Sequence, residues 1–246
     1  MKIIEINNLT KRFDDLVVLD DISLSVEEGE NLVVFGRSGT GKSVLLKCII
    51  GLMSPDNGEI LVKGQSITEL SIKKLNKVRK SIGFLFQGAA LYDSMTVREN
   101  LDFTLKRHIH LPQNEINKKI VQTLDMVNLR DAIDKMPSEL SGGMRKRIGL
   151  ARAIIIDPEI MFYDEPTTGL DPITSKEISD LILNLQNQLN MTSIVVTHDL
   201  ICAEIIANRA IFLRDGKIAY EGKIETLTAS TDPFLINFFS HDFVKE

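Results

Sequence analysis

The hydrophobic pattern along the first part of the chain predicts a strand, a glycine loop and a helix. Apolar and polar residues alternate over residues 22–26, which is typical of a strand with one buried face. Residues 31–35 form a short continuous apolar run, as in a strand buried on both faces. Gly36 interrupts this run, and the periodicity over residues 42–52 is helical.

The rest of the chain continues to alternate between the two patterns. Strands are predicted over residues 59–64, 81–86, 159–163, 192–196 and, with a break, 210–220. Helical periodicity covers residues 96–136, 141–156 and 173–189. Because strands and helices alternate, we expect an α/β fold whose mostly parallel sheet has helices on both faces.

Composition and charge narrow the class of protein. The 246 residues are 43% apolar and 26% charged, with a net charge of -5, so we expect a globular chain without a basic surface for nucleic acid. The N-terminus lacks the long apolar stretch of a signal peptide, and the apolar residues 44–53 are too few to span a bilayer. Any membrane role is therefore expected to depend on a partner. Cys48 and Cys202 lie in apolar stretches and are interpreted as buried thiols of a cytoplasmic protein, not as a disulfide or a metal site.

The glycine loop carries the first chemical signal. Its eight residues fit the phosphate-loop pattern G-x-x-x-x-G-K-[ST]: Gly36, Arg37, Ser38, Gly39, Thr40, Gly41, Lys42 and Ser43. The glycines let backbone N–H groups point at phosphate oxygens, and the helix that follows, with Val44 in its first turn, adds its positive end. Lys42 can reach the outer phosphates and Ser43 suits Mg²⁺. The alternative is a loop that only turns the chain, but the flanking strand and helix favour the binding of a nucleoside triphosphate.

A second signal is the pair of carboxylates that ends the strand 159–163. Asp164 would lie beside the phosphate loop and hold Mg²⁺ through a water, and Glu165 is the candidate general base that activates water against the γ-phosphate. An apolar strand ending in acids is common by itself. The phosphate loop upstream favours the catalytic interpretation.

A third signal is a second helix start with an anion-binding character. Ser141 is a good N-cap, and Gly142 and Gly143 leave backbone N–H groups accessible. One nucleotide does not need two such helix ends from the same subunit. We therefore expect the second one to serve a nucleotide held by another copy of the chain.

Residues 140–144, LSGGM, resemble the signature motif of ABC ATPases, with Met144 where that family usually has glutamine. Other motifs of the family follow in the same order along nearly the whole chain. The resemblance implies that Gln87 is the Q-loop glutamine that touches Mg²⁺, that Asp171 belongs to the D-loop, that His198 contacts the γ-phosphate and that Phe13 stacks on adenine. Taken singly these residues have ordinary alternatives, and Phe13 in particular could be a core position.

The resemblance also implies the fold and its division. We expect an ABC ATPase fold over residues 1–246: a phosphate-loop NTPase core with N-terminal antiparallel strands, formed by residues 1–87 and 158–246, and an inserted helical subdomain over about 88–157. Two chains would pair head to tail around two MgATP. The helical subdomain would hold an integral membrane permease.

A narrower resemblance concerns the cargo. The stretches FQGAALYDSMTVRENLDF, KMPSELSGGMRKRIGLARAI and YDEPTTGLDPIT resemble the ATPases of Mla and MCE-type systems, which move phospholipids between the membranes of diderm bacteria. That implies an MCE-domain lipid-binding partner, a possible small STAS-domain partner and a peripheral location on the cytoplasmic face of the inner membrane. The C-terminal stretch TDPFLINFFS resembles the tail of these proteins and would either pack on the twin chain or complete the core.

Three other interpretations stay open at this point. The chain could drive an importer of amino acids or ions, which shares the same catalytic motifs. It could be a non-transport ABC ATPase of DNA repair or chromosome packing, although long heptad arms and basic surfaces are missing from the sequence. It could also be a regulatory module that binds ATP without hydrolysing it, which the presence of Glu165 and His198 disfavours.

Overall fold

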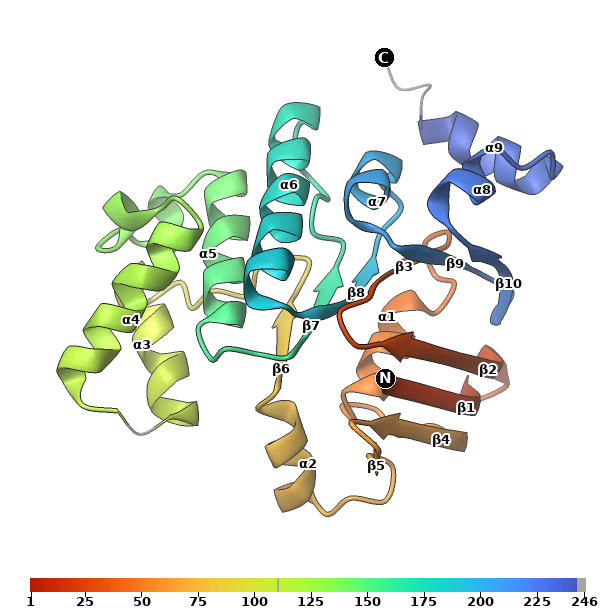
Figure 1. Cartoon of the computed structure of the whole chain (residues 1–246), viewed down its shortest axis with the longest axis horizontal. Coiled ribbons are helices and arrows are strands. Elements are labelled where there is room, and N and C mark those ends of the chain that lie inside the picture. The colour runs from red at the N-terminus through yellow and green to blue at the C-terminus, as the bar shows by residue number, and fades with distance from the viewer. Residues whose placement is uncertain (110, 243–246) are drawn as a thin grey trace. The chain divides into compact units, whose positions relative to one another are not determined.

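A computed structural model describes residues 1–109 and 111–242 of the chain. The chain is organised into two compact units. Unit 1 contains residues 1–78 and 192–246, and unit 2 contains residues 79–191. Figure 1 labels the helices and strands of both.

Unit 1 contains an antiparallel sheet built mainly from the N-terminal residues. Its strands lie in the order β2-β1-β4-β5, where the bounds are β1 (Lys2–Phe13), β2 (Leu16–Glu27), β4 (Asn57–Val62) and β5 (Gln65–Ser66). Ile22, Leu24 and Val26 of β2 are buried while Ser23 is exposed, which confirms the predicted alternation. The expected N-terminal antiparallel strands are therefore present.

The parallel strands of unit 1 are centred on β3. The bounds are β3 (Asn31–Phe35), β8 (Thr192–Val196), β9 (Arg209–Arg214) and β10 (Lys217–Gly222). Strand β3 pairs in parallel with both β8 and β9, and β10 is antiparallel to β9. Every residue of β3 and β8 is buried, as their continuous apolar runs predict.

The helices of unit 1 are short: α1 (Lys42–Ile49), α7 (Leu200–Ile206), α8 (Ile224–Thr228) and α9 (Pro233–Asp242), with α2 (Ile72–Arg79) at the end of its first segment. Helix α1 ends three residues before the predicted Leu52, because Gly51 adopts a left-handed conformation with φ 67° and its amide donates back to the carbonyl of Cys48 at 2.9 Å. Helix α2 was not predicted from the sequence, although Ile72, Leu75 and Val78 recur at helical spacing; of these three only Val78 is buried.

The C-terminal helix α9 completes the core of unit 1. The rings of Phe238 and Phe239 lie edge-on to Phe35, with centroids 5.9 and 5.7 Å away, and Phe238 lies 4.5 Å from Phe212. Within a single chain the tail therefore packs on the strand that leads into the phosphate loop, as the interpretation that it completes the core predicts.

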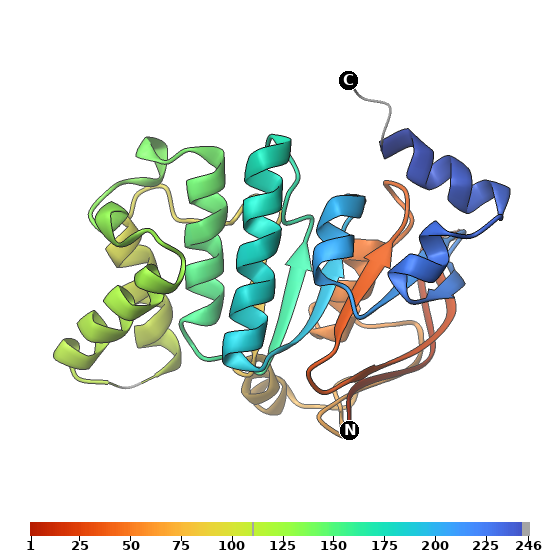
Figure 2. The same cartoon turned by 45° about the horizontal axis from the view of Figure 1, so that its top comes forward.

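Unit 2 consists of two parallel strands and a set of helices. Its elements are β6 (Ile82–Leu85), α3 (Val97–His108), α4 (Gln113–Met126), η1 (Arg130–Ala132), η2 (Pro137–Glu139), α5 (Gly142–Ile154), β7 (Ile160–Asp164) and α6 (Pro172–Leu189). Helices α5 and α6 lie side by side (Figure 2). The helical subdomain predicted over about 88–157 falls inside unit 2, and its boundary with the core stays a prediction.

The helical pattern predicted over residues 96–136 divides at Pro112, which caps α4. The apolar residues that carried the prediction are fully buried: Val97, Leu101, Leu105, Ile120, Leu124 and Val127. Within the described ranges, 1–109 and 111–242, none of the helices is long and apolar enough to cross a lipid bilayer.

Candidate nucleotide-binding and catalytic site

The side chain of Lys42 folds back over the phosphate loop of unit 1. The Lys42 ammonium donates to the carbonyl of Gly36 at 2.7 Å and to that of Arg37 at 3.1 Å. The Thr40 hydroxyl donates to the same Arg37 carbonyl at 2.9 Å. Because carbonyls of residues 36 and 37 are held inside the turn, the loop is a compact ring at the end of β3.

Gly41 connects the phosphate loop to α1. It adopts a left-handed conformation with φ 96°, and a Cβ atom there would lie 2.9 Å from the carbonyl oxygen of Val18. As the N-cap of α1 it offers no side chain to the first-turn amides, and the first turn, which contains Ser43 and Val44, has no acidic residue. The positive end of α1 is thus suited to a phosphate.

His198 follows β8 and lies at the same edge of the sheet as the loop. It is exposed, while the preceding Thr197 is buried and donates its amide to the Val34 carbonyl at 3.3 Å. The next residue, Asp199, caps α7 by accepting from the Cys202 amide at 3.1 Å. The histidine is therefore held between the end of a strand and the start of a helix.

Phe13 lies at the end of β1 with 43% of its surface exposed. The Lys11 ammonium lies 5.4 Å from the centroid of its ring. This exposure excludes the alternative that Phe13 is an ordinary core residue. A ring held by a long strand and open to solvent is suited to stacking.

Gln87 and the two carboxylates lie at one edge of unit 2. Strands β6 and β7 are parallel. Gln87 follows the first strand, Asp164 ends the second, and Glu165 comes directly after it. Glu165 is a non-glycine residue with φ 51°, and the Thr168 hydroxyl donates to its Oε2 at 3.1 Å. Left-handed conformations of this kind persist only where surrounding contacts hold them, and they concentrate at functional sites.

The helix start predicted at Ser141 is present in unit 2. Ser141 is the N-cap of α5, and its hydroxyl accepts a hydrogen bond from the Met144 amide at 3.2 Å. Ser141 and Gly142 are exposed. A residue with a side chain would be crowded in place of Gly143, because a Cβ atom there would lie 2.7 Å from Cγ2 of Thr174. The first turn of α5 is thus open to solvent at Ser141 and Gly142 and closely packed against Thr174 at Gly143.

Asp171 has a structural use besides the predicted one. Its carboxylate caps α6, accepting the Thr174 hydroxyl at 2.6 Å and the amides of Ile173 and Thr174 at 3.1 and 3.0 Å. The hydroxyl, and then these amides, hold the pKa of Asp171 below its ordinary value. Its predicted role near the nucleotide stays a prediction.

Two cations of α5 were missed by the sequence reasoning. Lys146 is buried and donates to the carbonyls of Gln87 and Glu165 at 2.7 and 3.0 Å, and Arg152 donates to the carbonyl of Ala90. The available signal was helical spacing, since Lys146 shares a face with the buried Gly149, at i+3, and Ala153, at i+7. A pocket of about 340 Å³ lies among these elements, lined by Gln87, Gly142, Arg145, Lys146, Gly169 and other residues.

Unit 1 thus brings together the phosphate loop and His198, and unit 2 brings together Gln87, Asp164 and Glu165. The shared binding of one Mg²⁺ by Ser43, Gln87 and Asp164 stays a prediction. Among the residues that the structure describes, no group of three or more His, Cys, Asp or Glu side chains is arranged to hold a metal ion.

A lysine folded over a glycine loop at the N-terminus of a helix defines the triphosphate site of phosphate-loop ATPases. A family model described as "ABC transporter" matches residues 19–168, and the chain belongs to that family. It is an ATP-binding subunit with the fold of the ABC ATPases, as the sequence predicted.

Individual relatives agree with this assignment. The chain is 44% identical over 236 residues to the intermembrane phospholipid transport system ATP-binding protein MlaF of Haemophilus influenzae, covering 96% of this chain and 89% of that protein. It is 39% identical to the probable ribonucleotide transport ATP-binding protein mkl of Mycobacterium bovis, covering 96% of this chain and 66% of that one. A solved structure, described as a dimeric post-hydrolysis state of the ATP-binding cassette MJ0796 bound to ADP and Pi, superposes with a TM-score of 0.82 at 32% identity and covers 90% of this chain and 98% of that one.

Proposed function

We propose that this ATPase powers a transporter that moves phospholipid between membranes, working as a head-to-tail pair on the cytoplasmic face of the inner membrane. The observation that carries the paired arrangement is the exposed tip of α5 at Ser141, a second helix N-terminus suited to an anion in addition to the phosphate loop. The cargo rests on the 44% identity to a phospholipid-transport ATP-binding protein over almost the whole chain.

In this proposal unit 1 holds the nucleotide of its own chain. The amides of residues 36–44 and the Lys42 ammonium bind the phosphates, and the exposed ring of Phe13 stacks on adenine. His198, at the edge of β8, contacts the γ-phosphate. Residues 141–143 of the second copy close over the same nucleotide.

Hydrolysis is assigned to the residues that end β6 and β7. Mg²⁺ would be held by the oxygens of Ser43, Gln87 and Asp164 together with the phosphates, a donor set of hard oxygens that suits this ion. The ion would neutralise charge on the phosphates. Glu165 positions the attacking water and accepts its proton.

The membrane partner is assigned to an aromatic pair on unit 2. Tyr92, in the loop after β6, is 44% exposed, and Phe103 on α3 is 36% exposed, with ring centroids 5.2 Å apart. Exposed aromatic pairs are typical anchors of protein interfaces. We assign this surface to an integral permease, which an MCE-domain lipid-binding protein and a small STAS-domain protein would accompany.

Reconstitution tests the cargo. The chain would be purified with its membrane partner and placed in vesicles that carry a labelled phospholipid. We expect ATP to drive transfer of the label and Glu165→Gln to stop it. Intact ATP hydrolysis without lipid movement would contradict the phospholipid assignment, and ATP-dependent uptake of a labelled ribonucleotide in the same vesicles would favour the activity named for mkl.

A further inference from the structure

Lys146 joins two backbone segments that lie on either side of the proposed catalytic edge. It is on α5, five residues after Ser141, and only 6% of its surface is exposed. Its ammonium donates to the carbonyl of Gln87 at 2.7 Å and to the carbonyl of Glu165 at 3.0 Å. One cation therefore holds the main chain at the ends of β6 and β7 together.

The contact to Glu165 meets a specific structural need. With φ 51°, Glu165 occupies a conformation that side chains other than glycine, asparagine and aspartate rarely adopt. Lys146 fixes its carbonyl, and the Thr168 hydroxyl fixes its carboxylate at 3.1 Å. Both ends of the residue are thus held, and the direction of the carboxylate depends on both contacts.

Charge supports the same arrangement. Burial is the main influence on the pKa of Lys146 and lowers it, while the nearby Glu165 and Asp164 oppose that shift. A buried ammonium is tolerated when its donors are satisfied and negative charge lies close.

Close packing ties α5 to the segment that contains Gln87. A Cβ atom on Gly149 would lie 2.9 Å from Cβ of Ala89 and 2.9 Å from Cδ1 of Leu85. Arg152 adds a hydrogen bond to the carbonyl of Ala90. The helix therefore contacts this segment at Gly149 and bonds to it through Lys146 and Arg152, so a displacement of α5 disturbs the segment that contains Gln87.

We propose that Lys146 is a positioning residue that fixes the backbones of Gln87 and Glu165 for hydrolysis. Since Lys146 and Ser141 are on one helix, it also links the helix tip assigned to the second copy's nucleotide to the glutamate assigned to the chain's own nucleotide. The inference rests on the proposed roles of these residues. Lys146 itself need not touch the nucleotide.

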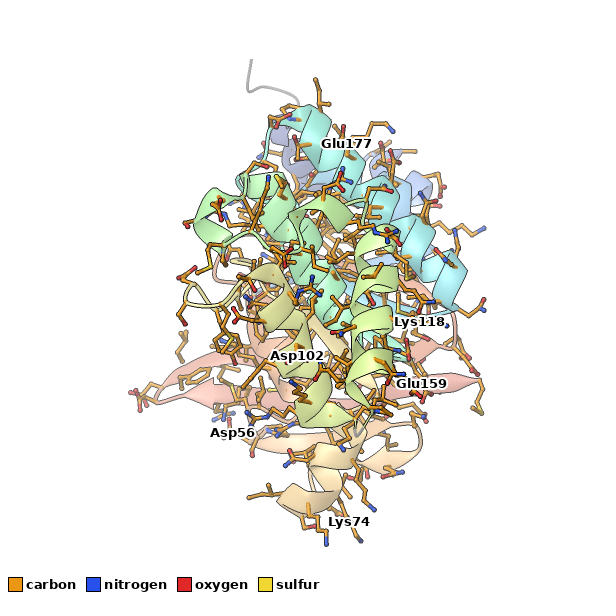
Figure 3. The ribbon with its side chains drawn as sticks, turned by 90° about the vertical axis from the view of Figure 1, so that its left-hand side faces the viewer. Asp56, Lys74, Asp102, Lys118, Glu159 and Glu177 are labelled. Carbon is orange, nitrogen blue, oxygen red and sulfur yellow. The ribbon has the colours of Figure 1, made fainter. Side chains whose placement is uncertain are left out.

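The test compares Lys146→Met, which keeps the length of the side chain and removes its donors, with Lys146→Arg, which keeps donors for both carbonyls. Arg147→Met is the matched control on the same helix, because Arg147 makes an ion pair at 2.8 Å with Glu177 of α6, a residue labelled in Figure 3. We expect Lys146→Met to lower kcat at least about tenfold and to change the Kd for ATP by less than about threefold. Lys146→Arg should recover most of kcat, and Arg147→Met should leave it unchanged.

Hydrogen exchange separates this inference from the proposed function. Backbone amides of residues 86–90 and 164–168 should exchange faster in Lys146→Met than in Arg147→Met, whether or not the chain hydrolyses ATP. Faster exchange of these amides in Lys146→Met with an unchanged kcat, in an active enzyme, would overturn the inference. Equal losses of kcat and ATP affinity would overturn it as well. An inactive wild-type chain with the expected exchange difference would instead count against the proposed function alone.

Discussion

Val34 on β3 lies directly opposite Val196 on β8 in a parallel register. Two residues farther along, the first strand reaches Gly36 and the second reaches His198. The amide of Thr197 donates to the Val34 carbonyl at 3.3 Å and so continues the pairing one residue beyond the strand. Strand register alone therefore places the start of the phosphate loop and the histidine at one edge of unit 1.

The same spacing occurs in unit 2. Leu85 on β6 is paired with Tyr163 on β7, and two residues later the strands reach Gln87 and Glu165. Side chains that leave the carboxyl ends of neighbouring parallel strands meet at the same edge, where ligands of α/β proteins bind. In each unit, therefore, the predicted site residues are brought to one edge in the same way, by the register of two parallel strands.

Lys42→Ala should abolish nucleotide binding or turnover. The substitution removes the cation that would neutralise the outer phosphates, so we expect the ATPase rate to fall at least about 100-fold, as when a donor to a developing charge is lost. Steady-state ATPase activity and binding of a fluorescent ATP analogue measure the effect. Lys47→Ala, at an exposed position of the same helix, is the control and should keep both. Activity preserved in Lys42→Ala would refute the assignment of the loop.

Phe13→Ala should weaken ATP binding with little effect on kcat. Loss of one stacked base is worth about 1–3 kcal/mol, so the Kd for ATP should rise between about fivefold and about 150-fold. Leu16→Ala is the control, since Leu16 is 66% exposed at the start of the neighbouring strand β2. Equal affinities in the two variants would remove Phe13 from the nucleotide site.

Tyr92→Ala combined with Phe103→Ala should release the chain from membranes. The aromatic pair is the surface assigned to the permease, while neither ring belongs to the proposed hydrolytic edge. We expect the fraction that sediments with membranes to fall several-fold and the ATPase rate of the isolated chain to stay unchanged. Lys118→Ala, on the exposed side of α4 in Figure 3, should leave membrane association intact. Normal sedimentation of the double variant would move the permease contact elsewhere.

Cys48 should be unreactive in the folded chain. Both cysteines are free and buried, as predicted, and burial raises the pKa of the Cys48 thiol from 9.0 to about 11. Since the folded pKa is the higher one, the thiol's contribution to stability is full below pH 9 and is lost as the pH rises towards 11. A thiol reagent at pH 8 should label neither cysteine until the chain is unfolded, and rapid labelling of the native chain would contradict this burial.

The sequence predicted best those features that follow from local rules. Strands β3 and β8 have the predicted bounds because a continuous apolar run ended by polar or glycine residues has few other outcomes. Ser141 caps α5 as predicted, because an N-cap depends on one side chain and the next turn.

The features missed by the sequence depend on tertiary contacts. Lys146 is the clearest case: in a helix start with three basic residues in succession, a lysine is expected to face solvent, and only the packing of α5 against the ends of β6 and β7 buries it. The capping role of Asp171 was likewise not predicted, because the residue was assigned only to the D-loop motif. Phe13 could be separated from a core residue only by its exposure in the structure.

In the proposed pair the tip of α5 binds the nucleotide of a second copy. Glu165→Gln should keep ATP bound and accumulate the closed pair, which light scattering detects as a doubled mass. Adding Ser141→Asp places a carboxylate against the partner's γ-phosphate while preserving a good N-cap, and Ser141→Asn is the neutral control with an equally good cap. With ATP, the Asn double variant should dimerise, and the Asp double variant should stay monomeric although it binds ATP. Dimerisation of the Asp variant to the same extent would contradict the proposed pair.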